Sequence, residues 1–333
     1  MQPKRVRSRA ADRRDIVVVG ASLGGVQALQ QFATDLPPAF PASVLVVQHI
    51  GANPSTLPAL LSSAGPNPAS HAKDGEPLKH GHIVVAPPDH HLLISAGKLK
   101  LSRGPKEHFS RPAVDILFRS AAIECGPRAI GVVLTGTLDD GTAGLRAIKQ
   151  CGGIGIVQDP ASAFAPSMPA SALQNVQVDF CLPLEQIAKK LLSLVSEKVR
   201  RGSVPPRELV REQSPWTGTV NAMKDLAAMG TPSPLTCPEC GGGLWEINQA
   251  RPPRFRCHTG HGYSLKTLQH AMHGTTEGLL WAAERALQAD AVISHRMAEE
   301  LRRTNDSAGA DEDAHATAHE RKANQLRRLI EEL

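Results

Sequence analysis

The sequence predicts an α/β protein: a doubly wound, mostly parallel sheet with helices on both faces, followed by a small zinc-binding unit and a C-terminal helical hairpin. Between residues 15 and 198, short apolar runs alternate with amphipathic helical patterns. The runs are almost continuously apolar, which is typical of parallel strands buried on both faces. With 333 residues, the chain is long enough for a catalytic domain of about 200 residues and a smaller unit.

Seven apolar runs are predicted as strands: Ile16–Gly20, Val44–Gln48, His82–Ala86, Leu92–Ser95, Ile130–Thr135, Ile154–Gln158 and Val178–Leu182. Six helices are predicted to begin near Gly24, Ser55, Pro112, Thr142, Ser167 and Leu184. Gly97 separates one strand from a further apolar run at Leu99–Leu101, which indicates an antiparallel hairpin inserted into the sheet.

Ser22 is predicted to lie at the corner between the first strand and the first helix. The β-branched run Ile16–Val19 is followed by Gly20-x-Ser22-x-Gly24, the sequence motif of a nucleophile elbow. At such a corner the unpaired N–H groups and positive dipole end of the helix point at an attacking Oγ. The alternative is the phosphate-binding turn of a dinucleotide domain. It is disfavoured because G-x-G-x-x-G is absent and the second strand ends in His49 rather than an acid.

Polar side chains follow two further predicted strands. His49 follows the second strand, and Asp139-Asp140-Gly141 follows the strand at residues 130–135. Each residue alone has an ordinary structural explanation, as a helix cap, a strand terminus or a turn. Together, at one edge of a parallel sheet, they form the hydroxyl, imidazole and carboxylate that acyl transfer requires. Their order differs from that of α/β-hydrolases, so the elbow spelling does not predict that fold.

Four motifs in order resemble the catalytic domain of the chemotaxis protein-glutamate methylesterase (CheB-type) family. They are Val-Val-Gly-Ala-Ser-Leu-Gly-Gly at 18–25, Val-Gln-His at 47–49, Arg-Pro-Ala-Val-Asp-Ile-Leu-Phe-Arg-Ser-Ala-Ala at 111–122 and Leu-Thr-Gly-Thr-Leu-Asp-Asp-Gly at 134–141. The resemblance implies Ser22 as nucleophile, His49 as base and Asp140 as acid. It also implies hydrolysis of γ-glutamyl methyl esters on chemoreceptors with release of methanol, and in some members deamidation of glutamines.

The sequence departs from the family's pattern near the expected site. Leu23 stands where the family commonly has Thr, and Thr137 and Leu138 replace Met and Gly. Backbone N–H groups near Leu23 and Thr137 can still form an oxyanion hole, although the acyl pocket changes shape. Arg111 is either a contact for an acidic substrate segment or a surface charge. Because only about fourteen residues precede the first strand, we expect no control by the family's N-terminal receiver domain.

Charge and composition limit the classes of partner that the chain can bind. The net charge is +5, and six of the first fourteen residues are basic. No aromatic residue is interleaved with them to stack on bases, so residues 1–14 are expected to be a disordered basic tail and not a nucleic-acid arm. No apolar run reaches the length of a membrane span. We therefore expect a cytoplasmic protein, without membrane insertion, that acts on a protein substrate.

Residues 199–235 are rich in Arg, Pro, Ser and Thr and predict a linker with one short helix at Val220–Met229. The unit that follows, residues 236–275, contains Cys237-x-x-Cys240 and, after sixteen intervening residues, Cys257-His258-x-x-His261. This spacing predicts tetrahedral zinc bound by Cys237, Cys240, Cys257 and His261, with His258 as the rival fourth ligand. Four protein ligands predict a structural metal and no cofactor for catalysis. A redox Cys-x-x-Cys is disfavoured because no α/β pattern surrounds it.

Residues 276–333 predict a helical hairpin or coiled coil. Leu280, Leu287, Ser294 and Leu301 recur every seven residues, and spacings of three and four continue from Ala316 to Leu333. Such a hairpin can form a homodimer, dock a partner or cover the zinc unit.

The sequence therefore favours a serine esterase of the methylesterase family. The main alternative is a non-catalytic or retargeted relative that acts as a scaffold in a signalling complex. The least favoured hypothesis is that the chain is a dinucleotide-binding protein.

Overall fold

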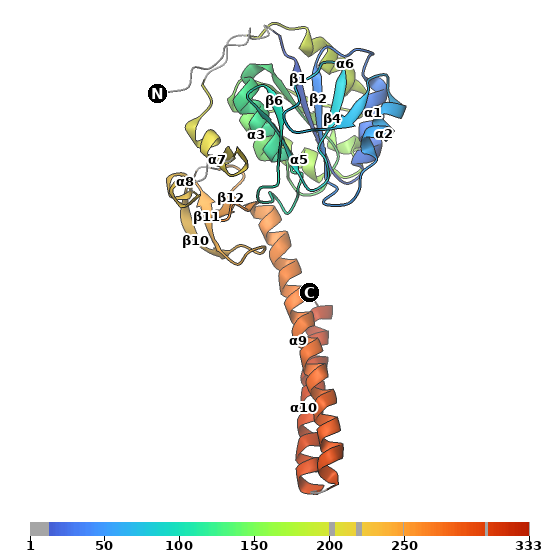
Figure 1. The fold of residues 1–333 in the computed structure, drawn as a ribbon, viewed down its shortest axis with the longest axis vertical. Coiled ribbons are helices and arrows are strands. Elements are labelled where there is room, and N and C mark those ends of the chain that lie inside the picture. The colour runs from blue at the N-terminus through green and yellow to red at the C-terminus, as the bar shows by residue number, and fades with distance from the viewer. Residues whose placement is uncertain (1–12, 200–203, 218–221, 249, 304–305, 333) are drawn as a thin grey trace. The chain divides into compact units, whose positions relative to one another are not determined.

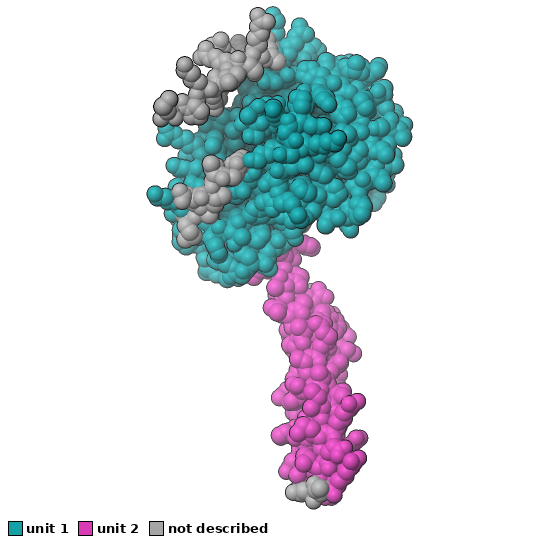
Figure 2. Space-filling view, viewed as in Figure 1, with its two compact units in different colours: residues 1–267 teal, residues 268–333 magenta. Residues whose placement is uncertain are grey.

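The computed structural model describes residues 13–199, 204–217, 222–248, 250–303 and 306–332. The chain divides into two compact units, residues 1–267 and 268–333, which Figure 2 colours separately. The basic tail predicted at residues 1–14 lies outside the described residues except for Arg13 and Arg14.

The first unit is built on a seven-stranded sheet in which every paired strand is parallel, in the order β3-β4-β2-β1-β7-β8-β9. The central strand β1 (Ile16–Ala21) lies between β2 (Ser43–Gln48) and β7 (Ala129–Val133). The outer strands are β3 (Ala69–His71), β4 (His82–Val85), β8 (Ile154–Gln158) and β9 (Phe180–Leu182). The predicted α/β class is confirmed.

Helices cover both faces of this sheet (Figure 1). One face carries α1 (Gly25–Asp35), α2 (Leu57–Ala64) and α6 (Leu184–Val195); the other carries α3 (Val114–Cys125), α4 (Thr142–Gln150) and α5 (Ser167–Asn175). Alternate residues of β1 supply the two cores: Val17 and Val19 belong to one apolar cluster, and Val18 belongs to the other. Burial on both faces explains why the strands are uninterrupted apolar runs. Short 3₁₀ helices occur at Gly126–Arg128 and Pro160–Ser162.

The hairpin predicted around Gly97 exists, but its insertion into the main sheet is wrong. Strands β5 (His91–Ser95) and β6 (Lys98–Ser102) form a separate two-stranded sheet. It lies against α3, where the Ile94 amide donates to Ser120 Oγ at 3.0 Å. Polar side chains of α3 therefore replace the main-sheet hydrogen bonds that the apolar pattern suggested. Strand β3 was not predicted because its three residues are only half-buried and lack an apolar run.

The segment predicted as a linker contains helices α7 (Arg207–Thr217) and α8 (Ala222–Met229), followed by β10 (Gly230–Thr236). Helix α7 packs onto the catalytic domain. Trp216 is buried with Leu93 and Ile116, and its indole N–H donates to the Pro105 carbonyl at 2.8 Å. The Pro and Arg content of this segment concealed the single large aromatic residue that anchors it.

A second, antiparallel sheet follows in the order β10-β11-β12-β13, with β11 (Gly243–Ile247), β12 (Arg254–Cys257) and β13 (Gly262–Ser264). The grouped cysteines lie on its strands and turns. We call residues 230–267, which comprise this sheet and the first residues of the next helix, the cysteine module.

Two long helices, α9 (Leu265–Arg302) and α10 (Asp306–Glu331), form the C-terminal hairpin, and α9 begins earlier than the periodicity from residue 276 indicated. The buried residues of α10 recur every seven positions and are mostly small: Gly309, Ala316, Ala323 and Ile330. Small side chains allow the helices to approach closely. Cross-helix contacts between Arg327 and Glu284, at 2.9 Å, and between His295 and Asp313, at 2.8 Å, fix their antiparallel order.

Gly20 of β1 is required by the close approach of α3. A Cβ added there would lie 2.3 Å from Val114 Cγ1. We expect Gly20→Ala to lower the free energy of unfolding by about 1–3 kcal/mol because the added methyl overpacks this contact. Adding Val114→Ala should restore part of the loss. Denaturant unfolding of both variants measures this, and equal stability of Gly20→Ala and wild type would contradict the packing described.

Candidate active site

The carboxyl ends of three neighbouring strands bring Ser22, His49 and Asp140 together. Ser22 follows β1, His49 follows β2 and Asp140 lies in the loop after β7. His49 Nδ1 lies 3.1 Å from Ser22 Oγ, and His49 Nε2 lies 2.8 Å from Asp140 Oδ2. The chain first extends the sheet from β1 to β2 and β4, and later returns to add β7 on the other side of β1. The carboxyl edge at such a reversal of strand order is the usual ligand-binding position in doubly wound sheets. The predicted convergence of the three residues is present.

The backbone around Ser22 is held in place from three directions. The Ser22 amide donates to the Thr135 carbonyl at 2.9 Å, and the Ser22 carbonyl accepts from the Gly25 amide at 2.8 Å. Gln48 Nε2 donates to the same carbonyl at 2.8 Å. Gly24, the N-cap of α1, has φ 74° and ψ 3°, a left-handed conformation that glycine adopts without strain. The turn therefore presents the Ser22 hydroxyl from a rigid support.

Gln48 and Thr135 are supporting residues that the sequence reasoning did not single out. Thr135 Oγ1 donates to the Leu23 carbonyl at 2.9 Å and accepts from the Ala165 amide at 2.8 Å. Both residues lie inside motifs quoted above, so their motif membership was the available signal. Their contacts join the β1 turn to the ends of β2 and β7.

The Asp140 carboxylate lies at the N-terminus of α3. Its Oδ2 accepts from the Val114 amide at 2.7 Å as well as from His49, and its Oδ1 accepts from the amides of Asp115 at 2.9 Å and Gly141 at 2.8 Å. Burial opposes ionisation, but the hydrogen bond from His49 and the nearby charge of His108 outweigh it and lower the pKa of Asp140 to about 2. Asp140 is therefore an ionised acceptor at neutral pH.

Asp115 makes the reciprocal contact at the start of α4. Its Oδ1 accepts from the amides of Gly141 at 3.0 Å and Gly144 at 2.6 Å. Asp140, which precedes α4, thus binds unpaired N–H groups at the start of α3, and Asp115, which lies in α3, binds those at the start of α4. At both positions the helix dipole favours negative charge. Gly144 permits the close crossing of α3 and α4, because a Cβ there would lie 2.5 Å from Phe118 Cβ.

His108 is a buried imidazole behind the acid. Its Nε2 donates to Asp115 Oδ2 at 3.0 Å and lies 3.9 Å from Asp140 Oδ1, and its Nδ1 donates to Thr267 Oγ1 at 3.1 Å. Burial disfavours its charge, but the Asp115 hydrogen bond and the charge of Asp140 raise the pKa of His108 to about 9. The sequence carried no signal for this residue, because its partners lie on distant segments.

The loop that carries Asp140 passes directly beside Ser22. A Cβ added to Gly136 would lie 2.9 Å from Ser22 Cβ and 2.1 Å from Met168 Sδ. Thr137 is the next residue along this loop. Among the described residues, neither the Leu23 nor the Thr137 amide donates to a protein acceptor. Both amides are available to bind a developing oxyanion.

Arg111 is occupied by contacts within the protein. Its Nε and Nη2 donate to Asp89 Oδ1 at 2.9 and 2.6 Å, and its Nη1 donates to the carbonyls of Arg103 and Gly104 at 3.0 and 2.9 Å. These bonds tie the end of β6 to the loop before α3. The structure therefore gives Arg111 a bracing role within the fold.

The cysteine module brings four donor atoms together. One atom each of Cys237, Cys240, Cys257 and His261 lies within 4.8 Å of the others. Cys240 Sγ is 3.7 Å from Cys257 Sγ, and His261 Nδ1 is 3.6 Å from Cys257 Sγ and 3.7 Å from Cys237 Sγ. A zinc tetrahedron with Zn–S of about 2.3 Å and Zn–N of about 2.0 Å has edges of about 3.5–3.8 Å, so the residues present fit this ion. Glu239 Oε2 lies 3.6 Å from His261 Nε2, where it can orient the ring.

Comparison with known proteins identifies the family. The family model described as CheB methylesterase matches residues 17–191, more than half of the chain. The chain belongs to the CheB methylesterase family. All three residues at the carboxyl edge of the sheet lie within the matched region.

Two relatives show how far the similarity extends. The chain is 38% identical over 182 residues to a putative protein-glutamate methylesterase/protein-glutamine glutaminase of Leptospira interrogans, covering 54% of this chain and 94% of that protein. It is 40% identical over 188 residues to protein-glutamate methylesterase/protein-glutamine glutaminase 2 of Anaeromyxobacter dehalogenans, covering 56% of this chain and 55% of that protein.

A solved structure also matches. The crystal structure of the Thermotoga maritima CheB methylesterase catalytic domain aligns with a TM-score of 0.52 and 36% identity, covering 54% of this chain and 98% of that domain. The matched share corresponds to a catalytic domain, and the cysteine module and the helical hairpin are additional to it.

Leu138 illustrates a departure from the CheB pattern. Its φ is 63°, a left-handed conformation that costs a non-glycine residue about 1 kcal/mol or more. The Leu138 carbonyl accepts from Ser167 Oγ at 3.0 Å, which helps to hold the loop in this conformation. The loop that carries the acid thus keeps a backbone shape suited to glycine while presenting a larger side chain.

His108 makes stability depend on pH in a defined window. Its folded pKa of about 9 exceeds the unfolded value of 6.5, so its charge stabilises the fold fully below pH 6.5 and the stabilisation is lost as pH rises through 9. The groups that face it are Asp115 on α3, Asp139 and Asp140 in the acid loop, and Glu107 beside it in the chain.

We expect the difference in unfolding free energy between wild type and His108→Gln to shrink by up to about 3 kcal/mol between pH 6.5 and 9. Denaturant unfolding of both proteins across this range, with the metal content held equal, measures the difference. A difference that stays constant with pH would contradict an imidazolium at this position.

Proposed function

We propose that this member of the CheB methylesterase family is a serine hydrolase that removes methyl esters from glutamyl side chains of a chemoreceptor or another signalling protein. The observation that carries the proposal is the unbroken hydrogen-bond chain from Ser22 through His49 to the ionised Asp140. Further support comes from relatives that align over the whole of this domain and are named protein-glutamate methylesterase/protein-glutamine glutaminase.

The proposed mechanism follows from the protonation states. Ionised Asp140 accepts a hydrogen bond from His49 Nε2, which keeps the proton on that nitrogen and leaves the lone pair of Nδ1 facing Ser22. Nδ1 takes the Ser22 proton as Oγ attacks the ester carbonyl, and the imidazolium then gives that proton to the departing methoxide. Methanol leaves and an acyl-enzyme remains. Water, activated by the same imidazole, releases the glutamate and restores Ser22.

The negative oxygen of each tetrahedral intermediate would accept from the amides of Leu23 and Thr137. Backbone donors keep this role whatever side chain stands at the position, so the replacements relative to the family are compatible with activity. Leu23 is 53% exposed and Phe164, beside Gly24, is 77% exposed. These two side chains give the entrance an apolar rim. Deamidation of glutamines, which the names of the relatives include, would proceed through the same acyl-enzyme with ammonia as the leaving group.

We also propose that the cysteine module binds one structural zinc through Cys237, Cys240, Cys257 and His261. The tetrahedral spacing of the donor atoms supports this, as does the Glu239 carboxylate behind His261. His258 is not part of the converging group. None of the six cysteines is in a disulfide, consistent with the reducing cytoplasm in which we propose the protein works.

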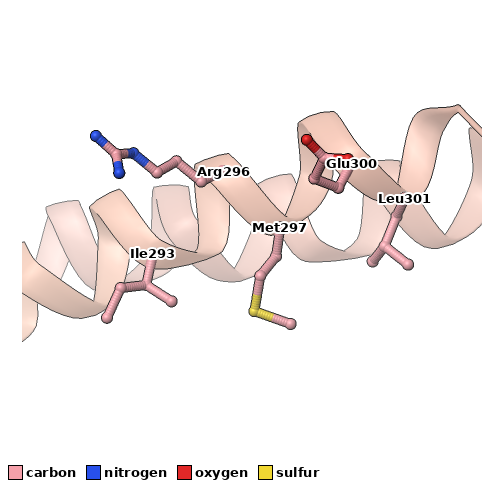
Figure 3. Close-up of a pocket in the computed structure, with 5 residues that line it drawn as sticks. All are labelled: Ile293, Arg296, Met297, Glu300 and Leu301. Atoms are coloured by element: carbon pink, nitrogen blue, oxygen red, sulfur yellow. The ribbon is translucent and has the colours of Figure 1, made fainter.

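The C-terminal hairpin is proposed to contact a second copy of the chain or a partner helix. Five residues of α9 line a shallow pocket on its surface: Ile293, Arg296, Met297, Glu300 and Leu301. In Figure 3 the apolar side chains of Ile293, Met297 and Leu301 project to one side of the helix, and Arg296 and Glu300 project to the other. The Ile293 and Met297 side chains are 55% and 49% exposed and lie next to each other. Neighbouring exposed apolar side chains of this kind are typical of a surface that contacts another protein. Among the described residues, no helix is both long enough and apolar enough to cross a bilayer.

Substitution of the three proposed catalytic residues tests the esterase. We expect Ser22→Ala, His49→Ala and Asp140→Asn each to lower turnover by about three orders of magnitude or more, because members of a triad act as a unit. Methanol release from methylated receptor, together with the melting temperature of each variant, is the measurement.

Asp140→Asn retains acceptor capacity for α3, so its loss of turnover should exceed any loss of stability. Leu60→Ala, at an exposed position on α2, is a matched control that should leave turnover unchanged. Full methanol release by Ser22→Ala would remove Ser22 from the mechanism. A pure scaffold would release no methanol even as wild type.

Metal analysis tests the zinc site. We expect one zinc per chain in the wild-type protein, and loss of most of it in Cys257→Ser and His261→Ala, because each removes one of four ligands. His258→Ala, whose imidazole lies outside the group, is the matched control and should keep its zinc. Retention of zinc by His261→Ala together with loss from His258→Ala would reverse the assignment of the fourth ligand.

A further inference from the structure

We propose that the cysteine module is a positioning element of the esterase site: Ser264 and His108 connect its metal-binding turn to the loop that carries Asp140, so that the esterase works only while the module is folded around its metal. This inference rests on the proposed esterase function and deepens it by naming a means of regulation. Ser264 and His108 act as positioning residues, since neither contacts the reacting atoms.

The first connection runs through the backbone of β13. The His108 amide donates to the Gly262 carbonyl at 2.8 Å, and the Gly262 amide donates to the Lys106 carbonyl at 3.2 Å. Gly262 directly follows His261, a proposed metal ligand. A Cβ at Gly262 would lie 2.5 Å from Glu107 Oε2, so a larger residue there would have to displace the buried Glu107 carboxylate. The segment that holds His108 is therefore paired, like a short strand, with the residue next to the metal site.

The second connection is the N-cap of α9. Ser264 Oγ accepts from the Thr267 amide at 3.0 Å, as an N-cap serine does, and donates its own proton to Asp139 Oδ1 at 2.8 Å. Asp139 immediately precedes Asp140, and its carbonyl accepts from the Thr142 amide at 3.1 Å at the start of α4. One hydroxyl thus joins the beginning of α9 to the acid loop.

Thr267 and His108 complete the hydrogen-bonded path from the cysteine module to Asp115 and Asp140. Thr267 Oγ1 accepts from His108 Nδ1 at 3.1 Å and from the Ser264 amide at 2.9 Å. On its other side His108 donates to Asp115, which shares Gly141 as a donor with Asp140. The path from the module to the triad acid therefore consists of buried, fully paired polar groups, and none of these residues is exposed.

Buried charges hold the module against the catalytic domain. Glu107 accepts from Arg119 of α3 at 2.9 Å and from Arg256 of β12 at 3.0 Å, and all three residues are buried. Arg256 also donates to the Gly260 carbonyl, in the turn between the ligands Cys257 and His261, at 2.8 Å. Separation of the module would leave Arg119 and Glu107 without Arg256 in a buried site, which is strongly disfavoured.

Loss of the metal would first disorder the turn from Cys257 to His261, from which both connections begin. The turn from Cys257 to His261 has only a few hydrogen bonds of its own, and without the ion three thiols and an imidazole are left to hold it. Disorder of that turn would release Gly262 and Ser264, and with them the supports of His108 and Asp139. Asp140 would then lose its fixed orientation toward His49. Because Ser22, Leu23 and the apolar rim lie elsewhere, we expect kcat to fall while KM changes little.

The test uses the full chain and two readouts: methanol release from methylated receptor, and the rate at which a fluorophosphonate probe labels Ser22. We expect Ser264→Ala to lower kcat and the labelling rate by on the order of tenfold to a hundredfold, as misplacement of a catalytic group does, with KM within about twofold of wild type. Ser264→Thr, which keeps the hydroxyl, should restore both rates.

Ser233→Ala is the matched control. Ser233 lies in the same module, but its hydroxyl bonds the Leu244 carbonyl at 2.9 Å and does not contact the acid loop. It should behave as wild type. Removal of zinc by a chelator should lower the labelling rate of wild type at least as much as Ser264→Ala does, and readdition of zinc should restore it.

Each outcome decides the inference. Labelling rates in Ser264→Ala equal to those in Ser233→Ala, or full labelling after the metal is removed, would overturn it. A zinc-loaded Ser264→Ala protein with low kcat separates positioning from catalysis by the metal, since a catalytic metal would leave this variant active. If wild type is labelled rapidly but releases no methanol, the proposed substrate is wrong. The labelling rates of the variants still test whether the cysteine module positions Asp140.

Discussion

A buried carboxylate at the start of a helix is the constraint on which the rest of this site depends. Asp140 is removed from water, and it remains ionised because the hydrogen bond from His49 and the nearby charge of His108 outweigh the effect of burial. The backbone amides of Val114, Asp115 and Gly141 supply its other hydrogen bonds. Asp115 makes the mirror contact at α4, so neither helix end can move without exposing an unpaired acid. The orientation of His49 toward Ser22 follows from this fixed acceptor, and the chemistry follows from that orientation.

Close packing is the condition for placing that carboxylate. Glycines at 20, 136 and 144 let α3, α4 and the acid loop approach β1 and each other to distances that a Cβ would prevent. The same packing that buries the core therefore brings the three strand ends within hydrogen-bond reach. The close packing of the core and the geometry of the Ser22, His49 and Asp140 group are therefore two results of one arrangement.

The cysteine module extends this arrangement beyond the family's catalytic domain. The spacing of its cysteines indicated a separate unit joined by a linker, whereas Trp216, Glu107 and Arg256 join it to the domain through buried contacts. A structural metal ordinarily stabilises only the unit that contains it. Here the turn that carries the proposed zinc ligands Cys257 and His261 precedes the N-cap of α9, and Ser264 of that cap donates to Asp139, which is adjacent to Asp140. In the coupling that we propose, the order of this turn controls the orientation of Asp140 toward His49.

The sequence by itself determined the α/β class, the convergence of Ser22, His49 and Asp140, and the grouping of the cysteines. Apolar periodicity marks strands, the carboxyl ends of parallel strands share one edge, and ligand spacing within a turn is local. Only the tertiary structure decided the parts played by His108, Asp115 and Ser264, the separate position of the β5–β6 hairpin and the internal contacts of Arg111. These depend on partners as far apart as His108 and Thr267, 159 positions away in the chain. No local pattern of residues encodes which buried polar groups will meet, because that is settled by how the packed elements bring them together.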